Sequence, residues 1–154
     1  MKTDFAAILE QYGKSINVER LSLDEQGSCM IGLEDVLVSL IWIEKDDYLH
    51  ICAPVGPWGE VDDEECFCRE LLTIGASGHG KGGFSVGLDQ EFGVLTLSLR
   101  IPGAALTPAS IQEFITAFVV EASGLQARIE LLQQKTVAPN AEAISSIGMD
   151  ILRV

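Results

Sequence analysis

The chain has 154 residues and a formal net charge of -13 at pH 7, yet 47% of its residues are hydrophobic and its mean hydropathy is +0.27. A chain of this length predicts one domain that builds its core without disulfides. Its charge excludes the phosphate backbones of nucleic acids and anionic membrane surfaces as partners. More apolar residues than a small core needs are typical of a protein with a buried partner interface.

The apolar runs and the cysteines indicate a cytosolic protein. The longest apolar run, residues 36–43, is much shorter than the roughly 20 residues of a membrane span, and the early charges of Lys2 and Asp4 argue against a signal peptide. We therefore expect no membrane insertion and reduced thiols. The four cysteines are Cys29, Cys52, Cys66 and Cys68. Because the last two are spaced C-x-C rather than C-x-x-C, no metal site is expected.

The first third of the chain predicts a helix followed by strands. Residues 3–13 are predicted to form an amphipathic helix, because apolar side chains recur at i, i+3, i+4 and i+7. These side chains are Phe5, Ile8, Leu9 and Tyr12. A short strand at residues 21–23 and a second strand at residues 28–33 are expected to form a hairpin. Residues 36–43, apolar on both faces, predict a strand covered on both sides, and residues 48–53 predict the returning strand.

The middle of the chain predicts a loop, a second helix and a glycine-rich connection. Residues 54–59 hold two prolines and two glycines and are expected to form a loop. Residues 61–74 keep a helical stripe, and the acids at 62–65 suit the positive end of its dipole. Consecutive acids on a helix point in different directions, so we expect capping and solvation rather than metal binding. Residues 75–83 hold five glycines and predict a mobile or tightly turned connection.

The last part of the chain predicts a hairpin and a long helix. Residues 84–88 and 94–101 are expected to pair, and Thr107 is expected to cap the helix that follows. Gly124 is expected to end or kink this helix, although the sequence up to residue 134 can continue it.

These elements predict an α+β fold. Without the short 21–23 segment, their order is helix, three strands, helix, two strands, helix, and the hairpins are too short for parallel crossovers. We therefore expect a twisted antiparallel sheet with the helices packed on it. One domain is expected over residues 1–135, and a C-terminal extension with an apolar side is expected over residues 136–154.

The chain offers little for catalysis. Residues 75–81 match the phosphate-binding pattern G-x-x-x-x-G-K, but Gly82 stands where Ser or Thr binds magnesium, and the loop follows a helix instead of a strand. His50 is interpreted as a sheet residue and His79 as an exposed one. We expect no enzymatic activity, no metal and no cofactor, with a small enzyme built on the glycine loop as the alternative.

Several segments follow the pattern of a known family. They are Tyr12-Gly13, the hairpin from Leu21 to Cys29, Asp46 to Ile51, Arg69 to Leu72, Phe84 to Asp89 and Gly93 to Leu97. With the apolar strand, the acidic second helix and the long final helix, they make residues 3–122 resemble the class I type III secretion chaperones, the Tir chaperone (CesT-like) family. Small size and strong acidity also fit this family.

The resemblance implies a homodimer of the bacterial cytoplasm that binds the N-terminal segment of a secreted effector and keeps it soluble and secretion-competent. Components of the secretion apparatus are further implied partners. The residues expected to bind the effector, along the first helix and the sheet, are Phe5, Ile8, Leu9, Tyr12, Val36 and Val38. Those expected at the dimer interface are Trp58, Phe67, Leu71 and Leu72. Two alternatives stay open: the first helix can instead use its apolar side chains as core, and the protein can instead be an adaptor or regulator of the same fold without an effector client.

Overall fold

The computed structural model describes residues 2–59, 61, 63–79 and 82–152, with backbone alone at residues 78–79 and 135–152. It contains a five-stranded antiparallel sheet in the order β1-β2-β3-β5-β4. The strands are β1 (Ser28–Leu33), β2 (Val36–Ile43), β3 (Tyr48–Pro57), β4 (Ser85–Asp89) and β5 (Val94–Pro102). The helices are α1 (Phe5–Ser15), α2 (Glu64–His79) and α3 (Pro108–Leu152), with a 3₁₀ turn η1 (Gly103–Ala105). The predicted α+β class, element order and antiparallel sheet are confirmed.

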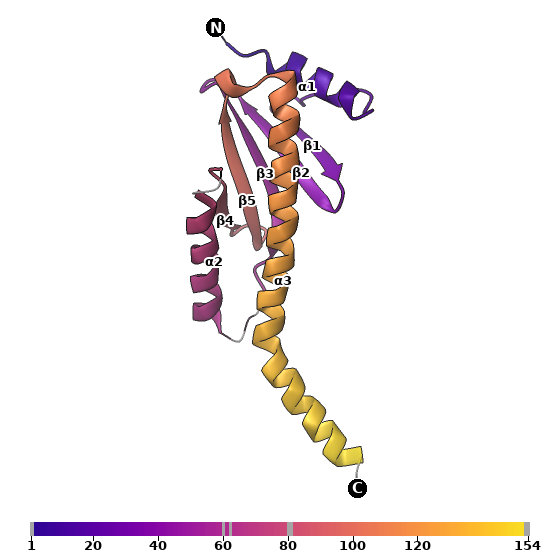
Figure 1. Ribbon diagram of the computed structural model, residues 1–154, viewed down its shortest axis with the longest axis vertical. Helices are drawn as coiled ribbons and strands as arrows, with labels where there is room; N and C mark the ends of the chain where they lie inside the picture. Colours follow the sequence, from indigo (N-terminus) through magenta and orange to yellow (C-terminus); the bar gives the residue numbers. More distant parts are fainter. Residues whose placement is uncertain (1, 60, 62, 80–81, 153–154) are drawn as a thin grey trace.

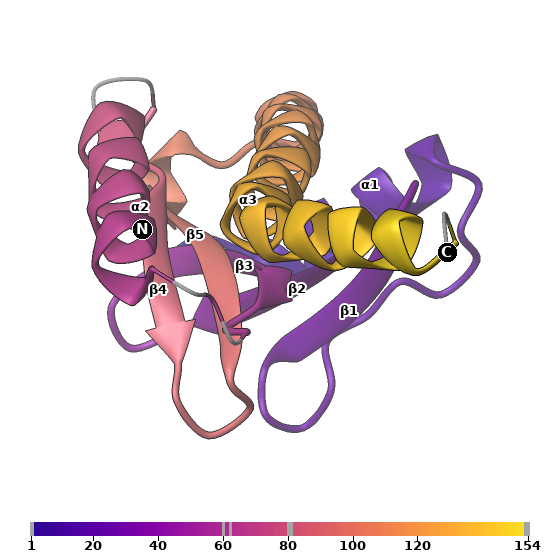
Figure 2. The same cartoon turned by 90° about the horizontal axis from the view of Figure 1, so that it is seen from below.

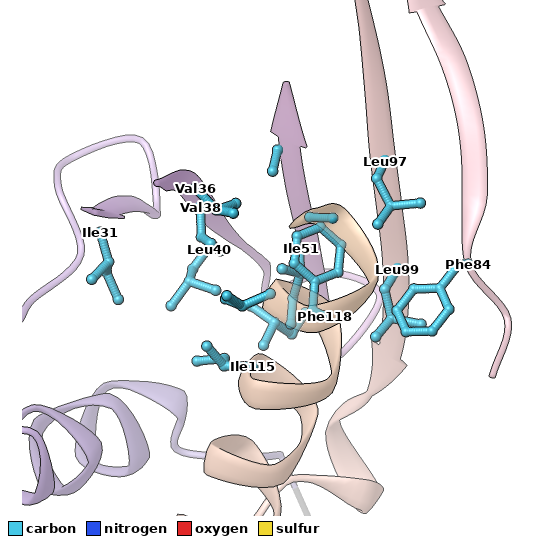
Figure 3. Close-up of a cluster of buried hydrophobic side chains, with 14 of the residues drawn as sticks. Ile31, Val36, Val38, Leu40, Ile51, Phe84, Leu97, Leu99, Ile115 and Phe118 are labelled. Atoms are coloured by element: carbon cyan, nitrogen blue, oxygen red, sulfur yellow. The ribbon is translucent and has the colours of Figure 1, made fainter. Parts of the chain in front are cut away.

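The three helices lie on one side of the curved sheet, with α3 across its middle, α1 over the β1–β2 side and α2 beside β4 (Figure 1, Figure 2). Alternate residues of β2, β3 and β5 point to this side and are buried beneath the helices. Figure 3 shows Val38, Leu40 and Ile51 of the sheet facing Ile115 and Phe118 of α3. We call this side the inner face of the sheet.

Helix α3 packs along the sheet because its buried side chains repeat at alternating spacings of four and three residues. They are Ile111, Ile115, Phe118, Ala122, Leu125 and Ile129. The helix starts with reciprocal hydrogen bonds, in which the Ser110 N–H donates to Thr107 Oγ1 at 3.0 Å and the Thr107 N–H donates to Ser110 Oγ at 2.8 Å. The expected cap at Thr107 is confirmed.

Helix α3 does not end or break at Gly124. The helix continues to Leu152 and extends past the end of the sheet (Figure 1). A single glycine costs a helix only about 1 kcal/mol, and the packing of Leu125 and Ile129 on the sheet offsets that cost. The Gln126 amide also donates to the Pro54 carbonyl at 3.3 Å.

The short strand expected at residues 21–23 is absent. Leu21 is instead buried against the end of α1, where its Cβ lies 2.7 Å from the place that a Cβ on Gly13 would occupy. The alternation of Leu21 and Leu23 therefore reflects packing beneath a helix and not strand pairing. Asp24 closes the following turn, since its carboxylate accepts hydrogen bonds from the Gln26 and Ser28 N–H groups and the Ser28 hydroxyl.

Strand β3 replaces the loop expected at residues 54–59. It runs to Pro57, with a register shift between Pro54 and Gly56 in its pairing with β5. Its pairing with β2 ends at Cys52, so the missing N–H groups of the two prolines leave no gap in a central ladder. Pro54 and Pro57 therefore lie in a part of β3 that pairs with β5 but not with β2.

Helix α2 is longer than expected at one end and shorter at the other. It begins at Glu64, where the Asp63 carboxylate accepts from the Cys66 N–H at 2.9 Å. It continues past Gly75 to His79, so the glycine-rich connection is shorter than residues 75–83. The side chains of His79 and Lys81 lie outside the described residues, and the expectations about them stay predictions.

Candidate partner-binding surfaces

The residues expected to bind an effector lie mainly in the core of this chain. Phe5, Leu9, Tyr12, Val36 and Val38 are buried, and only Ile8 is partly accessible. The Phe5 ring stacks on Trp42 at 5.0 Å between centroids. Burial raises the pKa of the Tyr12 hydroxyl. These side chains attach α1 to the sheet. In the single chain, therefore, the apolar side chains of the first helix serve as core, which is the alternative that the sequence left open.

The solvent-facing side of α1 borders a wide groove. The groove has a volume of about 1210 Å³ and lies between α1 and the segment that leads to β1. Its apolar lining comes from Ala6 and Ala7 of α1 and from Val18, Leu21 and Leu23 of that segment. Glu10 and Lys14, joined by a 2.7 Å ion pair, make its rim polar. A surface of this composition is less apolar than the second groove of the molecule.

The second groove lies between α2 and the edge strand β4, and we call it the α2–β4 groove. It has a volume of about 440 Å³ and is lined by Trp58, Cys68, Leu71, Leu72, Gly75, Val86, Leu88 and Leu95, with smaller residues between them. Leu72 is 75% exposed beside it. Of the residues expected at the dimer interface, Trp58, Leu71 and Leu72 therefore meet on one surface.

Phe67, the fourth of these residues, lies beneath the α2–β4 groove. It is buried, and its ring contacts Trp58 with centroids 5.6 Å apart. The Trp58 N–H donates to the Gly93 carbonyl at 2.8 Å, which fixes the start of the α2 segment on the β4–β5 hairpin. Phe67 thus supports the groove from below.

Two exposed apolar residues near this groove were missed by the sequence analysis. Leu88 is on β4 at the rim of the groove, and Phe92, 73% exposed, is in the β4–β5 turn. The sequence carried a signal for Phe92, because this residue follows a run of polar residues that is typical of a turn. In the structure the Asp89 carboxylate closes this turn by accepting hydrogen bonds from the Glu91 and Phe92 N–H groups. A phenylalanine in such a turn has no core to enter.

The side of the sheet opposite the helices forms the third surface, which we call the outer face. Its residues alternate with the buried ones along four strands: Ser28, Met30, Gly32, Leu37, Ser39, Ile41, Ile43, Tyr48, His50, Cys52, Thr96, Ser98 and Arg100. Met30 is 68% exposed on the edge strand β1. The Arg100 guanidinium carbon lies 3.9 Å from the centre of the Tyr48 ring. The sequence predicted cover on both sides only for residues 36–43, which are β2, and in the single chain no element covers the outer side of this strand.

The titrating groups near the outer face show no sign of catalysis. Burial and then the charge of Arg100 lower the pKa of His50. Burial raises the pKa of the Cys52 thiol, against a smaller opposing effect of its hydrogen bond from Ser39, and burial also raises the pKa of Cys29. These thiols are therefore poor nucleophiles. Within the described residues, no three His, Cys, Asp or Glu side chains gather as a metal site would require.

No helix among the described residues is long and apolar enough to cross a membrane. Cys29, Cys52, Cys66 and Cys68 form no disulfide within the described residues.

Comparison with known proteins gives matches along most of the chain. The profile of the Tir chaperone protein (CesT) family matches residues 7–126. The ExsC-ExsE complex superposes with a TM-score of 0.71 at 23% identity, covering 80% of this chain and 91% of that chain. The HopA1-SchA chaperone-effector complex superposes with a TM-score of 0.70 at 16% identity, covering 80% and 93%. The Yersinia pestis type III secretion chaperone SycH, in complex with a stable fragment of YscM2, superposes with a TM-score of 0.61 at 16% identity, covering 79% and 98%. No curated protein sequence matches the chain.

Proposed function

The chain belongs to the Tir chaperone protein (CesT) family, and from this premise we propose that it acts as a homodimer in the bacterial cytoplasm, binding the N-terminal segment of a secreted effector without enzymatic activity or a cofactor. One observation carries the proposal: a chain with a net charge of -13 gathers exposed apolar side chains on the α2–β4 groove and the outer face. A structural neighbour that is itself a chaperone-effector complex, HopA1-SchA, supports it.

The α2–β4 groove is the proposed dimer interface. Leu72 projects from α2 beside an apolar groove of its own chain, so a twofold axis near α2 lets each copy place its Leu72 against the groove of the other. Leu71, Trp58 and Leu88 line that groove. Phe67 contributes by holding Trp58 in place.

The effector segment is proposed to lie on the outer face and along the free edge of β1. An extended segment can pair with the unpaired backbone groups of an edge strand and place alternate side chains on the sheet. Met30 and Leu37 give this surface exposed apolar side chains. Ile8 stays a proposed contact, whereas contact with Phe5 or Leu9 would require α1 to move.

The domain boundary expected near residue 135 is also proposed here. The family profile ends at residue 126, and among the side chains that the structure describes, the hydrogen bond from α3 to the sheet farthest along the helix is donated by the Gln133 amide to the Pro57 carbonyl at 2.9 Å. Both support residues 136–154 as an extension added to the chaperone domain.

Co-purification tests the proposal. The chain is co-expressed with N-terminal segments, and separately C-terminal segments, of the proteins encoded beside its gene. We expect one N-terminal segment to be retained, whereas the C-terminal segment of the same protein is not. Leu37→Asp should release it, whereas Val120→Asp, at an apolar position on α3 that is even more exposed, should not. Failure to retain any segment would favour an adaptor of the same fold.

A further inference from the structure

The outer face differs in charge from the rest of the molecule. The chain has 23 acidic residues, yet none stands at an outward position of β1, β2, β3 or β5. A solvated face of an antiparallel sheet usually carries charged side chains on its outward positions. Asp89 of β4 faces the same side, but it pairs with Val94 at the opposite end of β5 from Arg100. Apart from Asp89, the outward strand positions are thus free of carboxylates, while Asp24 and Arg20 line a pocket with Ser28 and Ile41 at the β1–β2 end of the face.

Arg100 is the permanent charge of this face. It is exposed and makes no ion pair with any residue that the structure describes, in contrast to Lys2, Lys14, Arg69 and Arg128. Its guanidinium lies over the Tyr48 ring, a contact that holds the plane while leaving the N–H groups at its edge free. His50, its neighbour across the β3–β5 pair, has a lowered pKa and is neutral near pH 7.

Apolar side chains adjoin this cation. One row across the sheet runs Ile41, His50, Arg100, and the next row contains Ile43 and Tyr48. Neighbouring strands lie about 5 Å apart, so Ile41 and Arg100 are about 10 Å apart across the sheet. Side chains at i and i+2 of a strand-like segment are about 7 Å apart, so a client residue over Arg100 places its i+2 neighbour between His50 and Ile41. The surface therefore presents one guanidinium beside an apolar strip.

We propose that Arg100 selects the client segment through a carboxylate, so that the segment covering the outer face carries one Asp or Glu with an apolar side chain two residues away, on the side of Ile41. This inference rests on the proposed function. A carboxylate satisfies the free edge of a guanidinium with two parallel hydrogen bonds. Because the whole chain is strongly acidic, a client with many carboxylates is repelled, and the remaining positions of the segment are neutral or basic.

Charge favours a client segment over a second copy of the chain or a nucleic acid as the occupant of the outer face. A second copy laid face to face would bring two Arg100 cations together, and like charges disfavour such pairing. Nucleic acid is repelled by the net charge of -13. The α2–β4 groove, at the other edge of the sheet, is available for dimerisation at the same time.

The experiment uses two fluorescein-labelled peptides, Lys-Thr-Ile-Thr-Glu-Thr-Ile-Thr-Lys and the same peptide with Gln in place of Glu. Fluorescence anisotropy with the full chain gives both dissociation constants. We expect the Glu peptide to bind about tenfold more tightly, since one good charged pair is worth about 1.4 kcal/mol. Arg100→Gln should abolish this preference and Arg100→Lys should keep part of it. Arg69→Gln, which removes the same charge from α2, should leave the preference unchanged.

Equal affinity of the wild type for the two peptides, a preference that survives Arg100→Gln, or no binding of either peptide would overturn the inference. A circular-dichroism melt of each variant confirms that it is folded. The proposed function fails separately, when co-purification yields no retained effector segment. A chain that retains an effector but shows no Glu preference is a chaperone whose specificity lies elsewhere.

Discussion

The inner and outer faces of the sheet are built from the same strands but differ in burial and in composition. The inner face is a continuous apolar layer covered by α1 and α3, with no buried polar or charged residue in the described chain. The outer face mixes small polar residues with Met30, Leu37 and Ile41 and carries one cation. The apolar excess seen in the composition is thus divided between two kinds of surface: the inner face builds the fold, and the outer face with the α2–β4 groove is left uncovered.

The largest effect should come from a charge on the inner face. Leu9 is 0% exposed, so Leu9→Asp buries a carboxylate without a partner and should cost about 3–5 kcal/mol of unfolding free energy. Urea denaturation measures the loss. Ala6→Asp, at an exposed position of the same helix, should change stability by less than about 0.5 kcal/mol. Equal stability of the two variants would mean that α1 does not pack as described.

A charge in the α2–β4 groove should act on assembly instead. Leu72→Asp should weaken dimerisation more than tenfold, because a desolvated carboxylate at an interface costs several kcal/mol, while the monomer stays folded since Leu72 is exposed. Analytical ultracentrifugation measures the dimer constant. Leu131→Asp, another exposed leucine but on α3, is the matched control. A Leu72→Asp chain that dimerises like wild type would move the interface elsewhere.

Cysteine labelling distinguishes the surfaces without mutation. Cys66 is exposed, whereas burial raises the pKa of Cys52 on the outer face. Iodoacetamide reacts with thiolates, so Cys66 should be alkylated first, and Cys52 should become slower still once a client covers the outer face. Peptide mass spectrometry follows both sites. Protection of Cys66 alone would place the client away from the sheet.

The smallest effect concerns the turn before β1. Hydrogen bonds from Ser28, first from its hydroxyl and then from its N–H, lower the pKa of Asp24. A carboxyl whose pKa is lowered by folding stabilises the fold above its unfolded value of about 3.9, and this contribution is lost as the pH falls through the folded value. The stability difference between wild type and Asp24→Asn should therefore shrink below about pH 4. A difference that does not vary with pH would contradict this role of the turn.

The spacing of apolar residues was enough to predict most helices and strands, but it could not show which surfaces stay exposed. Phe5, Leu9 and Tyr12 marked α1 correctly because burial of one side imposes helical spacing. The same spacing could not tell whether that side faces its own sheet or a partner, and here it faces the sheet. Leu21 and Leu23 imitated a strand, and the prolines of β3 imitated a loop, because tertiary contacts decided both cases.

The partner surfaces depend on which strand faces are left uncovered, and this follows from topology. Leu71, Leu72 and Trp58 were grouped through family resemblance, and the structure brings them together with Leu88, which lies distant in sequence. Arg100 and Tyr48 are on strands joined only by β3–β5 pairing. No local pattern indicates such a pair.

Multi-angle light scattering tests the central claim most directly, applied to the purified chain alone and mixed with the N-terminal segment that it retains in co-purification. The account predicts a dimer near twice 16.6 kDa that gains the mass of the bound segment. A monomer whose mass does not change when the segment is added would contradict it.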